Sequence, residues 1–250
     1  MIVAIRKLFG LNLATLITRT EQKPCTCCHK EQVIMEDRVT MPIRSMRLFY
    51  STSFLLLALV SSASALDADL SQQVLAEINL VRTAPRTYSA LLREFRGRFQ
   101  GKSYLLPGSA TRMRTVEGKG AVDEAIRQLS RQKPLPPLSW SDGLAAAAAE
   151  LVAEQGRSGD TGHVGKQSHG LKERVNRHGS WERQIGENIG YGPKGARDMV
   201  MQLFIDDGVK GRGHRKNTLS RAFTTAGVAC GSHPRYGTMC VIDFAGGFRQ

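Results

Sequence analysis

The sequence predicts an α+β domain in which helices surround a small antiparallel sheet. Two runs of strand-forming residues, 226–230 and 239–244, flank a turn-rich segment near the C-terminus and predict an antiparallel pair. The alanine-rich run 143–155 follows Ser141-Asp142, which offers an N-cap, and predicts a long helix against which another element can pack closely. A sheet and helices of this size share one core, so a single domain is the simplest arrangement.

Apolar residues at helical spacing predict further helices upstream. They indicate a helix over residues 71–81, a second one after Pro85 and a short third one over residues 122–129. Residues 100–118 are rich in Gly, Ser and Thr, and this composition favours a loop. Gly156 is expected to end the alanine-rich helix.

A secretory signal precedes this domain. Arg44 and Arg47 form a basic region, the apolar run 54–60 follows, and small residues then allow cleavage near Ala65-Leu66. The apolar run is short for a membrane span, so we expect no transmembrane span in the mature chain.

The signal divides the chain into three parts. Residues 41–65 are the expected signal peptide, residues 66–250 are the mature protein, and residues 1–40 are a non-native or mis-annotated leader. We therefore expect a secreted or periplasmic protein. Cys230 and Cys240 are the only cysteines of the mature part, and an even pair in an exported protein predicts a disulfide.

The charge of the chain favours anionic partners. Residues 1–65 hold 8 of the 35 Lys and Arg residues and 4 of the 22 Asp and Glu residues, so the remainder carries a net charge of +9. Anionic cell-envelope polymers or lipid headgroups are the expected partners. The basic residues are scattered rather than clustered with aromatic residues, and nucleic acid is not expected.

Titratable residues gather between residues 186 and 217. Glu187 precedes an apparent strand, residues 196–207 predict a helix that ends in two acids, and His214 lies in a glycine-flanked turn. His163 lies upstream in a glycine-rich loop. Imidazoles with carboxylates suit a divalent transition metal or general acid–base chemistry, although the spacing alone matches no metal-binding helix motif.

The order of two short motifs resembles a known family. Gly186-Glu187-Asn188-Ile189, followed by Gly213-His214-Arg215-Lys216-Asn217, is similar to the paired signature of the CAP superfamily, the cysteine-rich secretory, antigen and pathogenesis-related proteins with an SCP domain. Residues 78–82, residues 138–141 and the cysteine-bearing terminal strands extend the resemblance over a core of residues 72–248. It is nearest to the bacterial-type secreted branch, and it implies a three-layer α-β-α sandwich.

The resemblance also implies a cleft of two histidines and two acids that can bind zinc or another divalent cation. Carried onto this sequence, the four positions are His163, Glu187, Asp206 and His214. His169 is the alternative first histidine. Asp207 is the alternative second acid, because helix phase does not separate the two aspartates. The family has Trp where Leu203 stands and Glu at the second acid position, and the shorter aspartate here places its carboxylate about one methylene further back.

Three functions follow from the resemblance. The first is an extracellular binding protein for lipid, sterol or cell-surface ligands, and it is favoured over an enzyme. The alternative is a metal-dependent hydrolase of peptide or cell-wall substrates, with Glu187 and His214 as its catalytic residues. In the second alternative, the four residues are purely structural. Residues 86–133 are longer than in compact family members and either extend the core or cover the edge of the cleft.

Overall fold

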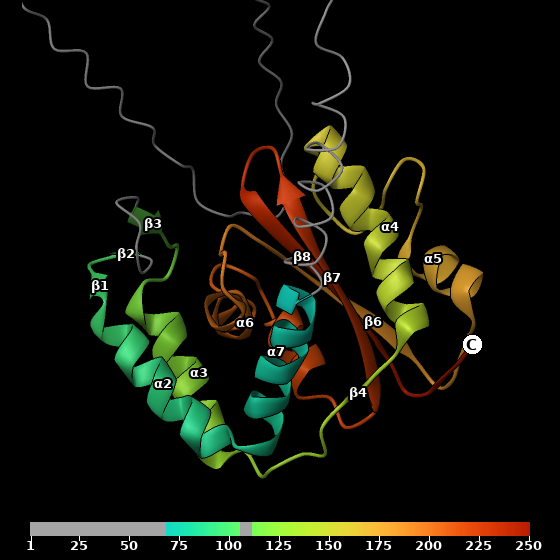
Figure 1. Cartoon of the computed structure of the whole chain (residues 1–250). Coiled ribbons are helices and arrows are strands. Elements are labelled where there is room, and N and C mark those ends of the chain that lie inside the picture. The colour runs from blue at the N-terminus through green and yellow to red at the C-terminus, as the bar shows by residue number, and fades with distance from the viewer. Residues whose placement is uncertain (1–68, 106–111) are drawn as a thin grey trace, which may run out of the picture.

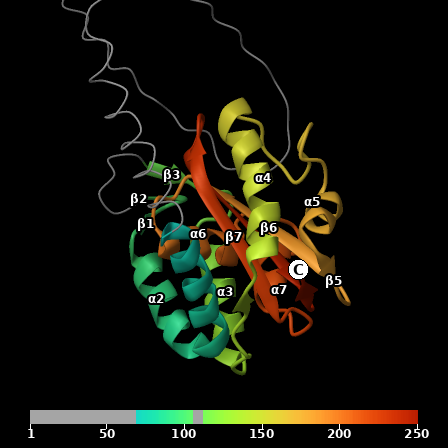
Figure 2. The ribbon, with the colours of Figure 1, turned by 45° about the vertical axis from the view of Figure 1, so that its right-hand side comes forward.

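A central sheet of four strands lies between two helical layers (Figures 1 and 2). The computed structural model describes residues 69–105 and 112–250, so the expected leader and signal peptide lie outside the described residues. The strand order is β4-β7-β8-β6, in which β4 runs parallel to β7 and the other pairs are antiparallel. The predicted α+β fold, a three-layer α-β-α sandwich, is confirmed. The strands of this sheet are β4 (Ser139–Trp140), β6 (Ile185–Tyr191), β7 (Thr225–His233) and β8 (Gly237–Ala245).

One helical layer contains α4 (Asp142–Ser158) and α5 (Leu171–His178). Figure 2 shows α4 lying along the sheet. A Cβ atom on Gly227 of β7 would come within 2.0 Å of the Ala145 backbone nitrogen, so only glycine allows α4 to approach β7 this closely.

The two ends of α4 follow from capping chemistry. The Ser141 hydroxyl accepts a hydrogen bond from the backbone N–H of Leu144 at 3.3 Å, as the sequence predicts. The expected end at Gly156 is wrong. The helix continues to Gly159, whose left-handed φ of 72° closes it. Gly156 instead faces β7, where a Cβ atom would lie 2.9 Å from the Ser232 carbonyl oxygen.

The other layer packs on the opposite face of the sheet and contains most of the apolar core. Its first helix spans residues 69–83, longer than predicted. Its further helices are α2 (Pro85–Gly97), α3 (Lys119–Arg131), α6 (Ala196–Ile205) and the short α7 (Gly213–Thr218). The largest cluster of buried apolar side chains joins these helices to the strands. Among the described residues, no helix is long and apolar enough to cross a membrane.

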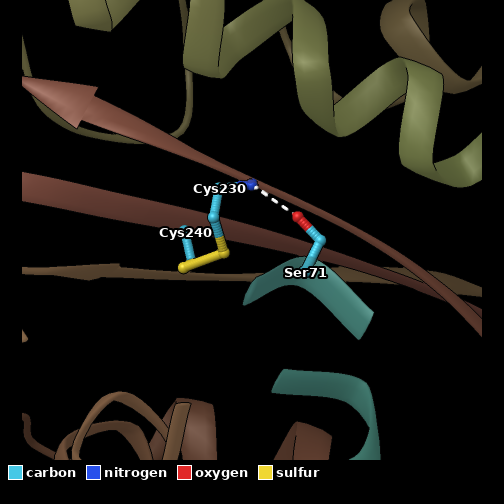
Figure 3. Close-up of a disulfide and its surroundings, with 3 residues drawn as sticks. All are labelled: Ser71, Cys230 and Cys240. Carbon is cyan, nitrogen blue, oxygen red and sulfur yellow. Dashed lines mark hydrogen bonds between the residues drawn. A yellow bond between two sulfur atoms is a disulfide. The ribbon is translucent and has the colours of Figure 1, made fainter. Parts of the chain in front are cut away.

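A disulfide joins β7 to β8 (Figure 3). Cys230 and Cys240 are directly opposite each other in the strand register, with 4.1 Å between their Cα atoms. The hydroxyl of Ser71, in the first helix, accepts a hydrogen bond from the backbone N–H of Cys230 at 3.0 Å. The predicted disulfide is therefore present, and it lies where the first helix meets the sheet.

The segment predicted as a loop after α2 contains a small three-stranded sheet, which is a correction. Its antiparallel strands are β1 (Phe99–Gln100), β2 (Ser103–Leu105) and β3 (Arg112–Arg114). Phe99, Tyr104 and Met113 are matched across the strands on the inner face, next to Phe95 of α2. The sequence missed this sheet because its strands are very short and glycine and serine separate its apolar residues. A further pair is formed by β5 (Ser180–Trp181) and β9 (Phe248–Arg249).

Candidate functional site

Glu187 forms the first of two histidine–acid pairs. It lies on the edge strand β6, and the Nδ1 atom of His163 lies 2.7 Å from one of its carboxylate oxygens. Arg174 of α5, which is fully buried, donates to the other oxygen. Because an ionised carboxylate only accepts, the imidazole donates through Nδ1. Both Glu187 oxygens are therefore occupied, while the His163 side chain is 53% exposed.

Glu154 of α4 holds the loop that carries His163. Its carboxylate accepts hydrogen bonds from the backbone N–H groups of Lys166, Gln167 and Ser168, at 2.6 to 3.3 Å. Burial alone would raise the pKa of Glu154. The hydrogen bonds from Ser168, Gln167 and Lys166 have the larger effect, and they lower this pKa to about 2. An ionised Glu154 therefore fixes the backbone that follows His163.

Asp243 lies beside Glu187, directly across the strands β6 and β8. Its side chain is fully buried. Burial, and then the negative charge of Glu187, raise the pKa of Asp243 well above its usual range, whereas Arg174 partly opposes this shift. The Glu187 carboxylate thus lies next to a second acid, Asp243, whose surroundings disfavour ionisation.

Asp206 and His214 form the second pair. The α6 helix ends at Ile205, because Asp206 adopts a left-handed conformation with φ of 57°. Aspartate tolerates this conformation better than most residues. One Asp206 oxygen lies 2.7 Å from His214 Nδ1, and the other accepts the His214 backbone N–H at 2.9 Å. The side chain of Asp206 is 1% exposed.

Asp207, the alternative acid, points to a different part of the molecule. Its two oxygens accept the backbone N–H groups of Val116 at 2.6 Å and Glu117 at 2.9 Å. It therefore ties α6 to the segment between β3 and α3. Arg212 supports the same connection, because its guanidinium donates to Glu117 and to Glu124 of α3. The Arg212 guanidinium contributes most to lowering the pKa of Glu117 to about 2.

Neighbouring residues of β6 support the two histidine–acid pairs. Glu187 holds His163, and the next residue, Asn188, donates from its side chain to the His214 carbonyl oxygen at 3.0 Å. Asn217 donates to the Glu187 carbonyl and to the Asn188 side chain, at 3.2 and 2.9 Å. Both pairs are therefore tied to adjacent residues of the same edge strand.

An apolar pocket opens beside the second pair. Its walls come from the inner face of β1–β3, from β6 and from α6, with Phe99, Tyr104, Met113, Ile189, Leu203 and Ile205 among them. Asp206 and His214 also line it, whereas His163 and Glu187 do not. The longer segment over residues 86–133 therefore extends the core through α2 and α3 and supplies one wall of this pocket.

Each histidine–acid pair has one feature that suits metal binding. A carboxylate that accepts from Nδ1 orients an imidazole so that Nε2 remains available as a ligand. Both His163 and His214 have this arrangement. Within the part of the chain that the structure describes, however, no group of three or more His, Cys, Asp or Glu residues could hold a metal ion. Each pair would thus offer a cation one imidazole nitrogen.

His169, the alternative first histidine, and His178 have structural contacts. His169 has a left-handed φ of 63°, and its carbonyl oxygen accepts from Arg174 at 2.7 Å. His178 contacts Glu150 through Nε2 at 2.6 Å. The sequence assigned no role to Glu154 or Asp243, because neither residue belongs to a recognisable motif. A buried acid in a strand pattern, such as Asp243, was the only available signal.

The fold and the two pairs together define a class of protein, the α-β-α sandwich with histidine–acid pairs at an edge strand. The profile of the CAP family, described as the cysteine-rich secretory protein family, matches residues 75–244. This match covers more than half of the chain, and the chain belongs to the CAP family. A comparison with curated proteins found no match.

Three of the solved structures that match this chain are bacterial proteins. An extracellular protein containing a SCP domain from Bacillus anthracis is 21% identical, with a TM-score of 0.36, over 50% of this chain and 37% of that one. An outer surface protein from Borrelia burgdorferi is 14% identical, with a TM-score of 0.39, over 52% and 96%. A cysteine-rich secretory protein from Staphylococcus aureus is 17% identical, with a TM-score of 0.36, over 58% and 46%. This chain thus spans less than half of two of these proteins, and no function is transferred from them.

Proposed function

We propose that this chain is an extracellular binding protein that takes the apolar part of a lipid-like or sterol-like ligand into the pocket. The polar end of the ligand would lie beside His214. One observation carries the proposal: the apolar walls and the His214–Asp206 pair line the same pocket. Ligand sites commonly combine a mostly apolar lining with a few placed polar groups.

Filling the pocket tests this proposal. Met113 is half-buried and lines the pocket from β3, so Met113→Trp places a larger side chain in it. We expect the affinity for a fluorescent fatty acid or for dehydroergosterol to fall about tenfold or more, because excess volume in a packed site costs about 1–3 kcal/mol. Fluorescence titration of the purified exported protein measures this affinity.

The matched control is Gln100→Trp, which adds the same side chain to the exposed outer face of the same small sheet. The control variant should bind both probes as the wild type does. Equal affinities of the wild type and Met113→Trp, or no binding by the wild type, would contradict the pocket proposal.

A divalent cation is a second proposed ligand. Zinc would use Nε2 of His163 and of His214, and it would supply positive charge that attracts an anionic ligand group. The two Nδ1–carboxylate contacts of 2.7 Å support this proposal, since each orients its imidazole. Calorimetric titration with zinc should give heat that a His163→Ala/His214→Ala variant lacks. Equal heats from both proteins would eliminate this site.

A binding role fits the residues better than hydrolysis. A hydrolase mechanism would use Glu187 as acid or base, but both of its oxygens are occupied by His163 and Arg174. A purely structural role is the remaining alternative, and it predicts that the wild type binds neither zinc nor the two probes.

We also propose that the chain is exported with cleavage near Ala65-Leu66. Membership of a family described as secretory supports export. N-terminal sequencing of exported protein should begin at or near Leu66, and an intact Met1 in exported protein would contradict this boundary.

A further inference from the structure

The small sheet β1–β3 has two different faces. Its inner face carries Phe99, Tyr104 and Met113 and forms a wall of the pocket. Side chains alternate along each strand, so the residues between these three face away from the protein. Leu105 and Arg112 are cross-strand partners on this outer face, and both are exposed.

The outer face is strongly basic. Arg114 of β3 and Lys102, in the turn before β2, are exposed beside Arg112. None of these three residues forms an ion pair with another described residue. Residues 95–116 contain no Asp or Glu, and the next acid along the chain, Glu117, is already paired with Arg212. Lys102, Arg112 and Arg114 therefore leave this face net positive, although the Asp207 carboxylate lies at one side of it, on the Val116 backbone N–H.

Exposed apolar side chains occur on the same segment. The described residues contain three exposed large hydrophobic side chains, and two of them are Leu105, at 39%, and Val116, at 44%. The backbone N–H of Thr115, next to Val116, donates to the carbonyl oxygen of Lys102 at 2.8 Å. Apolar and basic residues are thus held together at one edge of the molecule, where Figure 1 shows β1–β3 at one end of α2 and α3.

We propose that this face, defined by Lys102, Leu105, Arg112, Arg114 and Val116, docks on the surface of an anionic lipid bilayer. Basic side chains are attracted to anionic headgroups, and exposed apolar side chains gain by entering the interface. A soluble polyanion would use the charges but leave Leu105 and Val116 in water. A second copy of the chain would place like charges against each other.

Docking in this orientation places the outer side of the pocket wall against the bilayer. Two residues of the docking face, Arg114 and Val116, also line the pocket, so the face reaches the rim of the pocket. The inference still goes beyond the proposed ligand pocket, because docking does not require the pocket to be filled. The two proposals also fail separately. Met113→Trp should still bind vesicles, since Met113 faces inward.

Sedimentation of the purified exported protein with vesicles tests the docking face. The wild type should pellet with vesicles that contain phosphatidylglycerol, pellet far less with phosphatidylcholine alone, and dissociate as salt is raised. Arg112→Gln/Arg114→Gln should lower the partition coefficient on the order of tenfold or more, since each basic residue near an anionic surface contributes about fivefold.

The matched control is Arg86→Gln/Arg131→Gln, which removes the same charge. Both residues are exposed at the opposite end of α2 and α3, and this variant should partition nearly as the wild type does. Leu105→Ser should also reduce partition several-fold. Equal losses from both arginine pairs, or equal binding to neutral vesicles, would overturn the proposal. So would full binding by Leu105→Ser together with capture of soluble heparin through Arg112 and Arg114, because that result assigns the face to a polyanion.

Discussion

Asp243 is a carboxyl group with no exposed surface, placed across the strands from the ionised Glu187. Ionising it would leave a buried charge next to a like charge, with only Arg174 to offset it. Its raised pKa has a consequence for stability, because the same carboxyl titrates near its ordinary value of about 3.9 in the unfolded chain.

Between these two pKa values the folded state binds more protons than the unfolded state, so stability falls as pH rises through that window. Asp243→Asn removes this loss. We expect its free energy of unfolding, relative to that of the wild type, to increase from about pH 4 upward and to level off above the folded-state pKa. Urea unfolding at several pH values, with the disulfide intact, measures the difference.

The exposed Asp160 provides the control, because Asp160→Asn makes the same chemical change at a carboxylate that water solvates, and it should not reproduce the effect of Asp243→Asn. Any constant packing effect of the amide introduced by Asp243→Asn shifts the whole curve without changing its slope. Parallel curves for the wild type and Asp243→Asn would show that Asp243 is not a protonated acid in the folded protein.

The connection between α6 and the segment before α3 positions these two elements at the pocket. Asp207 accepts two backbone N–H groups there, while its neighbour Asp206 turns toward His214. Helix phase could not separate these two acids in the sequence, because the helix ends before both of them and Asp206 adopts a left-handed conformation.

Asp207→Ala should loosen this connection without disturbing the His214–Asp206 pair. We expect a stability loss of about 0.5–1.5 kcal/mol, because two backbone donors exchange the Asp207 carboxylate for water. Amide hydrogen exchange should accelerate at Val116 and Glu117, and Asp207→Asn, which keeps one acceptor oxygen, should show a smaller effect. Unchanged exchange at both amides in Asp207→Ala would refute the role of Asp207 as a connector.

Across the whole molecule, the sequence predicted those features that a short motif or a long periodic segment specifies. The terminal strands, the alanine-rich helix and the disulfide are of this kind, as is the α-β-α sandwich that the motifs around Glu187 and His214 imply. The sheet β1–β3 was missed because its strands are too short for a periodic pattern. The surroundings of Asp243 depend on strand register between residues far apart in sequence, and no local pattern reports register.

The proposed function depends on an apolar ligand that occupies the pocket between β1–β3, β6 and α6. Methyl NMR spectra of the exported protein, recorded during titration with a fatty acid, report on that pocket residue by residue. We expect shifts at the methyl groups of Met113, Leu203 and Ile205, and none at Leu144, which is buried against the other face of the sheet. Shifts confined to residues outside the pocket, or no shifts at saturating fatty acid, would contradict it.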